Sequence, residues 1–111
     1  MAYNNRGGIY LAQKKYDDAL ADFNAAIKLS STYAPSFNNK GVVLHKQEKY
    51  KEAIAEFDKA IKIKPNYGGA YVNRGITKEM IRDVDGGCAD WKKAEKLGEK
   101  QGRKFYINNC D

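Results

Sequence analysis

Three asparagines recur at one fixed interval, because Asn5, Asn39 and Asn73 lie 34 residues apart in a chain of 111 residues. A carboxamide donates and accepts hydrogen bonds, so three in register predict a row of hydrogen-bonding groups. An extended peptide presents alternating N–H and C=O groups, and such a row suits its backbone whatever its sequence. The alternative is structural, with asparagine serving as a hydrophilic residue that adjusts helix packing.

Few other residues offer chemistry of their own. His45 is the only histidine, and we expect it to line a groove or to face water. Neither cysteine has a sequence neighbour that would activate its thiol. The pair Gly86–Gly87 lacks the Lys-Ser/Thr of a phosphate-binding loop, and the remaining ligand positions of a calcium loop after "DVDGG" fall inside a predicted helix. We therefore predict no catalytic residues, no metal site and no cofactor.

The asparagines belong to a longer repeat, since aromatic, glycine and alanine positions recur with the same spacing. These sets are Tyr3, Phe37 and Tyr71; Gly7, Gly41 and Gly75; Phe23, Phe57 and Trp91; and Ala26, Ala60 and Ala94. In each unit the apolar residues follow two helical stripes, separated by the turns "QKKYD", "KQEKYK" and "IRDVDGG". The sequence predicts helices over 2–13, 17–29, 35–47, 51–63, 69–81 and 85–97, and a seventh over 100–109.

The recurring glycines carry a packing prediction. Glycine inside a helix costs about 1 kcal/mol relative to alanine. Gly7 is expected opposite Ala19, with Phe23 filling the space beside them. Three such glycines in register therefore predict close approach of the two helix backbones in each unit.

This order of residues resembles the tetratricopeptide repeat over nearly all of the chain. The second unit fits best, through Phe37, Gly41, Tyr50, Ala53, Phe57, Ala60 and Pro65. The resemblance implies an all-α fold, a right-handed α-solenoid of three helix-turn-helix repeats plus a capping helix. We expect repeats at 1–33, 34–67 and 68–98, the third divergent, and the capping helix at 99–111. We also expect one domain of bacterial type that is a fragment of a longer chain.

The resemblance implies that the first helix of each repeat lines an inner groove. A helical projection places Asn4, Asn5 and Gly8 on or beside the groove-facing flank, with Asn38 equivalent to Asn4. Related repeats with similar text are thought to hold a peptide backbone through this asparagine row. The predicted peptide-binding residues are Asn5, Asn39, Asn73, Gly8, Val42, Ile76, His45 and Lys46.

A carboxylate clamp, which in this family grips the C-terminal acid of chaperone tails, is not expected. It would need cations near Asn4 and at Gly69 and Asn73, and asparagine at Gly8 and Asn39. Only Asn39 satisfies the pattern.

The distribution of charged residues favours structural ion pairs over binding of an acidic ligand. The net charge is +6, spread along the chain. The cations Arg6, Lys40 and Arg74 recur in step with the acids Asp22, Glu56 and Asp90. This pattern predicts a ladder of structural ion pairs.

The sequence also argues against two classes of partner. Aromatic residues recur mostly at core spacing, so we expect no nucleic-acid partner. Apolar runs fall far short of the roughly 20 residues that cross a bilayer, so no membrane insertion is expected.

The two cysteines flank the predicted last turn. If the helices over 85–97 and 100–109 are antiparallel, Cys88 and Cys110 lie at the same height. A disulfide and two reduced, half-buried thiols both fit this pattern. A bridge would favour a bacterial periplasm or cell envelope, and reduced thiols would fit the cytoplasm.

Taken together, the pattern predicts a non-enzymatic scaffold that holds an extended segment of a protein or peptide partner in its concave groove. The alternative is a structural or assembly segment, which stacks or forms a homo-oligomer through its uncapped N-terminal face.

Overall fold

The computed structural model describes residues 2–110, and within this range it contains seven α-helices and no strand. The helices are α1 (Ala2–Ala12), α2 (Tyr16–Leu29), α3 (Ala34–Lys46), α4 (Tyr50–Ile63), α5 (Gly68–Met80), α6 (Val84–Lys96) and α7 (Lys100–Asn109). Every predicted helix is confirmed, with ends that agree to within one residue. None of the described helices is both long enough and apolar enough to cross a membrane.

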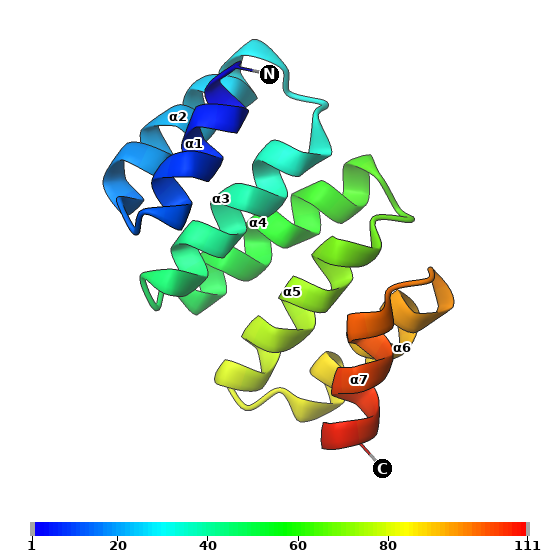
Figure 1. Cartoon of the computed structure of the whole chain (residues 1–111). Helices are drawn as coiled ribbons and strands as arrows, with labels where there is room; N and C mark the ends of the chain where they lie inside the picture. The colour runs from blue at the N-terminus through cyan, green and yellow to red at the C-terminus, as the bar shows by residue number, and fades with distance from the viewer. Residues whose placement is uncertain (1, 111) are drawn as a thin grey trace.

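Successive helices form hairpins that stack side by side (Figure 1). The pairs α1–α2, α3–α4 and α5–α6 are the three hairpins, and α7 packs against α6 at the C-terminal end. The first helices α1, α3 and α5 contact one another in sequence and form one layer, while α2, α4 and α6 form the other. The predicted all-α solenoid with a capping helix is confirmed.

Inside each of the first two hairpins, an aromatic ring lies directly on a glycine. A Cβ atom at Gly7 would lie 2.7 Å from Cε1 of Phe23, and one at Gly41 would lie 2.6 Å from Cε1 of Phe57. Burying a phenylalanine stabilises the fold by about 2–3 kcal/mol. This gain exceeds the helix penalty of glycine. In these two hairpins the nearest neighbour of the glycine is therefore the aromatic ring, not the backbone of the facing helix as predicted.

The third hairpin adapts the same contact to a larger ring. Trp91 occupies the phenylalanine position, and a Cβ atom at Gly75 would lie 2.6 Å from its Nε1. Gly87 replaces the alanine of the other hairpins, and a Cβ atom there would lie 3.0 Å from the carbonyl oxygen of Gly75. The divergence at Gly87 therefore lets α5 and α6 approach closely beside the tryptophan.

The first helix of each hairpin ends in the same way. Lys14, Glu48 and Arg82 adopt the left-handed conformation, with φ of 62°, 63° and 66°. In the second hairpin, the N–H of Lys49 donates to the Leu44 carbonyl (2.8 Å) and that of Glu48 to the His45 carbonyl (2.9 Å). This is the Schellman pattern, which usually has glycine at the left-handed position.

The predicted ion pairs connect the two helices within each hairpin. Arg6 donates two hydrogen bonds of 2.8 Å to the Asp22 carboxylate, and Arg74 binds Asp90 in the same bidentate way at 2.9 and 2.7 Å. Hydrogen bonding from Arg6 lowers the pKa of Asp22 below its ordinary value. The middle pair is weaker, because Lys40 Nζ lies 3.8 Å from Glu56. A structural ladder is thus confirmed, with bidentate pairs in the first and third hairpins.

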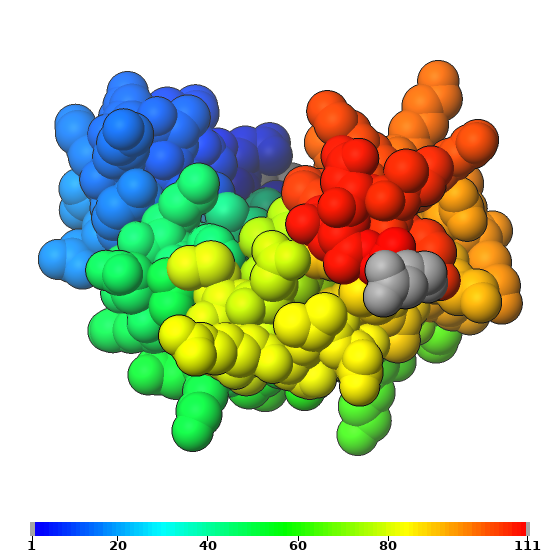
Figure 2. Space-filling view, turned by 90° about the horizontal axis from the view of Figure 1, so that it is seen from below, coloured from blue at the N-terminus to red at the C-terminus, as the bar shows by residue number. Residues whose placement is uncertain are grey.

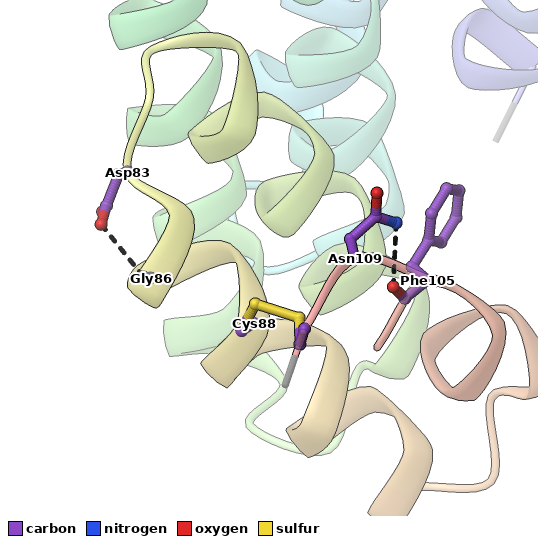
Figure 3. The surroundings of a disulfide bond; sticks show 6 residues. Asp83, Gly86, Cys88, Phe105 and Asn109 are labelled. Atoms are coloured by element: carbon purple, nitrogen blue, oxygen red, sulfur yellow. Dashed lines mark hydrogen bonds between the residues drawn. A yellow bond between two sulfur atoms is a disulfide. The ribbon is translucent and has the colours of Figure 1, made fainter. Parts of the chain in front are cut away.

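The C-terminal cap is attached to the third hairpin in two ways. A disulfide joins Cys88 of α6 to Cys110 just after α7, with the Cα atoms 5.9 Å apart (Figure 3). Phe105 of α7 also stacks on Trp91, with ring centroids 5.3 Å apart. Closing a loop of this length contributes about 3 kcal/mol in the chain-entropy model, so the cap is firmly attached.

The ring-on-glycine contact predicts opposite effects for two glycine substitutions. Gly41→Ala should lower the free energy of unfolding by about 1–3 kcal/mol, because the methyl group meets the buried Phe57 ring. Gly8→Ala should raise it by up to about 1 kcal/mol, because a Cβ there has no neighbour within 4 Å. Urea unfolding followed by circular dichroism measures both, and equal effects would contradict the packing argument.

The helix ends predict a stabilising substitution. Glu48→Gly should raise the free energy of unfolding by about 1 kcal/mol, since it relieves a left-handed non-glycine residue. The matched control is Gly98→Ala, where φ is 92° and a Cβ would again be free of contacts. It should lower stability by about the same amount. A loss of stability in Glu48→Gly would show that its side chain matters more than its backbone.

Candidate binding groove

One face of the solenoid is hollowed. Figure 2 shows a depression between the N-terminal hairpin, in blue, and α7, in red, with the green and yellow atoms of α3 and α5 at its floor. The first helices of the hairpins therefore line a concave surface, and the capping helix forms one of its walls. Residues on the exposed flanks of α1, α3 and α5 face any molecule that enters it.

This surface contains a cavity of about 140 Å³ between α3 and α5. Its lining residues are Val42, His45, Lys46, Phe57, Asn73, Ile76 and Thr77. Five of them are predicted site residues, so the structure brings that part of the set together. A dry cavity of about 150 Å³ can hold a benzene-sized molecule, so this one is large enough for an aliphatic side chain.

Two lining residues, Phe57 and Thr77, are absent from the predicted set. Phe57 comes from α4, and its ring reaches the groove because Gly41 leaves room for it. Thr77 aligns in the repeat with Val43, and both side chains are fully buried. The sequence did contain a signal for Thr77, because it is polar whereas the equivalent residue of the preceding repeat, Val43, is apolar.

The asparagines form hydrogen bonds between successive repeats. Asn39 donates through Nδ2 to Oδ1 of Asn4 (3.2 Å), and Asn73 donates in the same way to Oδ1 of Asn38 (3.1 Å). Each bond uses one of the two amide N–H groups, so the other N–H and the oxygen are left for a ligand. The asparagine row therefore has the alternative, structural role of joining successive repeats. The remaining N–H and carbonyl oxygen of each amide can still bind a ligand.

Two asparagines lie elsewhere than predicted. Asn4 and Asn38 are each only 8% exposed, because they lie between neighbouring hairpins. Asn4 accepts from Ser36 Oγ as well as from Asn39, both at 3.2 Å. The helical projection was wrong to put them beside the open flank, since it could not show which side meets the adjacent repeat.

Three predicted site residues lie outside the cavity, namely Asn39 on α3 and Asn5 and Gly8 on α1. Asn5 is exposed and has no hydrogen-bond partner among residues 2–110. Gly8 is partly exposed, with open space where a Cβ would be. The cavity thus lies between α3 and α5, and no residue of α1 lines it.

His45 is held in one tautomer by a short chain of hydrogen bonds. Thr77 Oγ1 donates its single proton to the Asn73 carbonyl oxygen at 2.9 Å. The hydroxyl oxygen Thr77 Oγ1 also lies 2.9 Å from Nδ1 of His45. Because the hydroxyl proton is used on the Asn73 carbonyl, Oγ1 accepts from the N–H of Nδ1. In the neutral ring Nε2 is then a hydrogen-bond acceptor. The Tyr50 ring also contacts the imidazole edge-on, with centroids 5.2 Å apart.

Burial lowers the pKa of His45, and the positive charge of the adjacent Lys46 lowers it further. Lys46 itself is exposed and has no ion-pair partner within residues 2–110. At neutral pH the cavity therefore presents an uncharged imidazole beside a free ammonium group.

The environment of His45 predicts a depressed titration midpoint. Since the folded pKa lies below the unfolded value of about 6.5, the neutral ring's contribution to stability is complete above that pH. The contribution is lost as the pH falls through the folded pKa. Because there is one histidine, proton NMR gives its midpoint without ambiguity, in the folded protein and in urea. A folded midpoint at or above the unfolded one would contradict the burial argument.

Comparison with known proteins agrees with this geometry. The family model of the tetratricopeptide repeat matches residues 1–66. No curated protein matches the chain in sequence.

Three solved structures share the fold, each with a TM-score of 0.91. The first tetratricopeptide domain of Spaghetti (RPAP3), bound to the HSP90 peptide SRMEEVD, is 16% identical and the match covers 96% of this chain and 86% of that one. The Arabidopsis OM64 domain is 21% identical, with 96% and 90% covered. The TPR2B domain of yeast Sti1, in a complex with pHsp70, is 19% identical, with 97% and 93% covered. With more than half of its length matched and its helices stacked as repeat hairpins, the chain belongs to the tetratricopeptide repeat family.

Proposed function

We propose that this protein is a non-enzymatic scaffold that holds an extended segment of a partner protein in its concave groove. The observation that carries the proposal is the cavity between α3 and α5, which combines apolar walls with amide, imidazole and ammonium groups on one face. A few polar groups converging on an apolar pocket are typical of ligand sites. The family and its structural neighbours are protein-interaction scaffolds, which supports the same function.

The chemistry of the groove favours a peptide in extended form. Asn39 and Asn73 each keep one N–H and one carbonyl oxygen after their bonds to the preceding repeat. These groups match the alternating donors and acceptors of an extended backbone. Because Asn39 and Asn73 are anchored by those bonds, their amides are already oriented before a ligand arrives, which reduces the entropy cost of binding.

Side-chain preference follows from the cavity. Val42, Ile76 and the Phe57 ring provide apolar surface for one aliphatic side chain of the ligand. Lys46, exposed at the same site, favours an acidic residue next to it. The ligand we propose is therefore an extended segment with an aliphatic residue flanked by an acid.

The chaperone tails named for the structural neighbours are not the ligand we propose. Those domains are described with HSP90 and Hsp70 peptides. At the three positions where the clamp needs cations, Asn4 is a buried amide, and Gly69 and Asn73 carry no charge. Without cations at these positions, a terminal carboxylate has no charged partner there.

A peptide array of extended sequences tests the proposal. The groove variant is Asn39→Ala with Asn73→Ala, and the matched control is Asn24→Ala with Asn66→Ala, two exposed asparagines outside the groove. Peptides that bind the wild type should bind the groove variant at least about 10-fold more weakly, a loss of about 1.4 kcal/mol. Binding to the control should be unchanged, and circular dichroism checks that both variants fold.

Two results would overturn this proposal. Equal binding by the groove variant and the wild type would remove the asparagines from the site. A preference for SRMEEVD over its scrambled version would show that a chaperone tail binds without the clamp cations. A second groove variant, Ile76→Glu, tests the cavity independently of the asparagines and should abolish the preference for an aliphatic residue.

A further inference from the structure

The boundary between α3 and α5 has a polar contact where the preceding boundary has an apolar one. His45 and Thr77 lie 34 positions after Leu11 and Val43, so the two pairs occupy equivalent places in the stack of repeats. Leu11 packs against the apolar cluster that contains Val43. His45 and Thr77 instead form a hydrogen bond of 2.9 Å. We call His45 and Thr77 the polar pair.

The packing of the repeats does not require this polarity. The preceding boundary shows that leucine and valine fill the same two positions, and Val43 is as fully buried as Thr77. A buried hydroxyl destabilises a fold unless it is hydrogen-bonded, and that of Thr77 is bonded to both the Asn73 carbonyl and His45. Since stacking alone does not explain the polar pair, its place on the wall of the cavity points to a role in ligand binding.

The polar pair fixes which ring nitrogen of His45 is left as an acceptor. Thr77 is fully buried and uses its hydroxyl proton on the Asn73 carbonyl, so Nδ1 of His45 donates to Oγ1. Nε2 of the neutral ring then has a lone pair and no proton. It has no hydrogen-bond partner among residues 2–110, and it is not one of the buried polar atoms that lack a partner. Nε2 is therefore an acceptor that a molecule in the groove can reach.

The charge at the cavity selects among the possible donors. Burial, and then the charge of Lys46, lower the pKa of His45, so the ring is neutral at neutral pH. The same ammonium group has no ion-pair partner within residues 2–110 and repels a lysine or arginine of the ligand. A carboxylate has no proton to donate, and a side-chain amide would bring a carbonyl oxygen that apolar walls leave unpaired. The donor that fits is a neutral hydroxyl.

We propose that His45 Nε2 selects threonine as the residue of the partner segment that fills the cavity. The threonine hydroxyl donates to Nε2, and its methyl group contacts the apolar walls formed by Val42, Ile76 and Phe57. This inference rests on the function proposed above, and it narrows the residue in the cavity from any aliphatic residue to one that carries both a methyl and a hydroxyl group. Thr77 is then a positioning residue, because it acts by holding His45 in one tautomer.

Peptides that differ in one side chain test the selection. An array of amidated peptides carries a Thr-Asp or a Val-Asp pair in the same set of varied flanking sequences, and fluorescence anisotropy gives the affinity of each matched pair that binds. Valine has nearly the shape of threonine, so the comparison isolates the hydroxyl. The wild type should bind the Thr-Asp peptides at least about 10-fold more tightly, because valine covers Nε2 and leaves it unpaired.

The preceding repeat supplies a matched variant. His45→Leu with Thr77→Val installs the residues of the equivalent apolar pair, so the variant should fold, which circular dichroism checks. It should bind the Val-Asp peptides more tightly than the Thr-Asp peptides, since the hydroxyl then has no acceptor. Equal affinity of the wild type for both kinds of peptide would overturn this inference and leave the proposed function standing. If the wild type bound no peptide of the array, both would be overturned.

Heteronuclear NMR of the ring nitrogens tests the role of Thr77 without any ligand. The chain has one histidine, so its ring signals are unambiguous. At neutral pH the wild type and Thr77→Ser should both show a protonated Nδ1 and an unprotonated Nε2. Thr77→Val should show a mixture of tautomers and a weaker preference for threonine, because Nδ1 has lost its acceptor. A protonated Nε2 in the wild type would contradict the inference, since the proposed acceptor would be absent.

Discussion

The separation of the two helices in every hairpin is set by a ring pressed against a glycine. Phe23 lies on Gly7, Phe57 on Gly41 and Trp91 on Gly75, so the same distance is imposed three times at 34-residue intervals. The ion pairs and the left-handed helix ends recur in the same 34-residue register. Uniform hairpins can stack on one another, and stacking leaves one flank of each first helix facing a shared groove.

The fold could be predicted from the sequence because its signals are local and repeated. Helix positions follow from the apolar stripes, and the hairpin contact follows from the glycine and aromatic register. The binding groove was harder to predict than the fold, because a helical projection gives the direction of a side chain and not the identity of its neighbour. Asn4 and Asn38 were therefore assigned to the wrong flank, and the bond between His45 and Thr77, which joins α3 to α5, could not be foreseen.

In the function we propose, the asparagines serve both the stacking of repeats and the recognition of the partner. A carboxamide has more hydrogen-bonding capacity than a single contact between repeats requires. Asn39 and Asn73 use one N–H each to join their helix to the hairpin before it. A groove built in this way acquires its binding groups as a by-product of assembly, so the spacing of those groups equals the spacing of the repeats. In the complex we propose, side-chain specificity comes from the residues that differ between repeats, such as Val42, His45 and Ile76.

The disulfide at the C-terminal end determines how the molecule responds to tension. Cys88 and Cys110 are 22 positions apart in sequence, and a pull applied to the C-terminus passes through their bond straight into α6. The intervening segment cannot be drawn out while the bond is intact, which withholds about 75 Å of contour length from a stretched chain. Mechanical extension is therefore confined to the chain before Cys88, and the bridged segment, which holds most of α6 and all of α7, lengthens only after the bond is reduced.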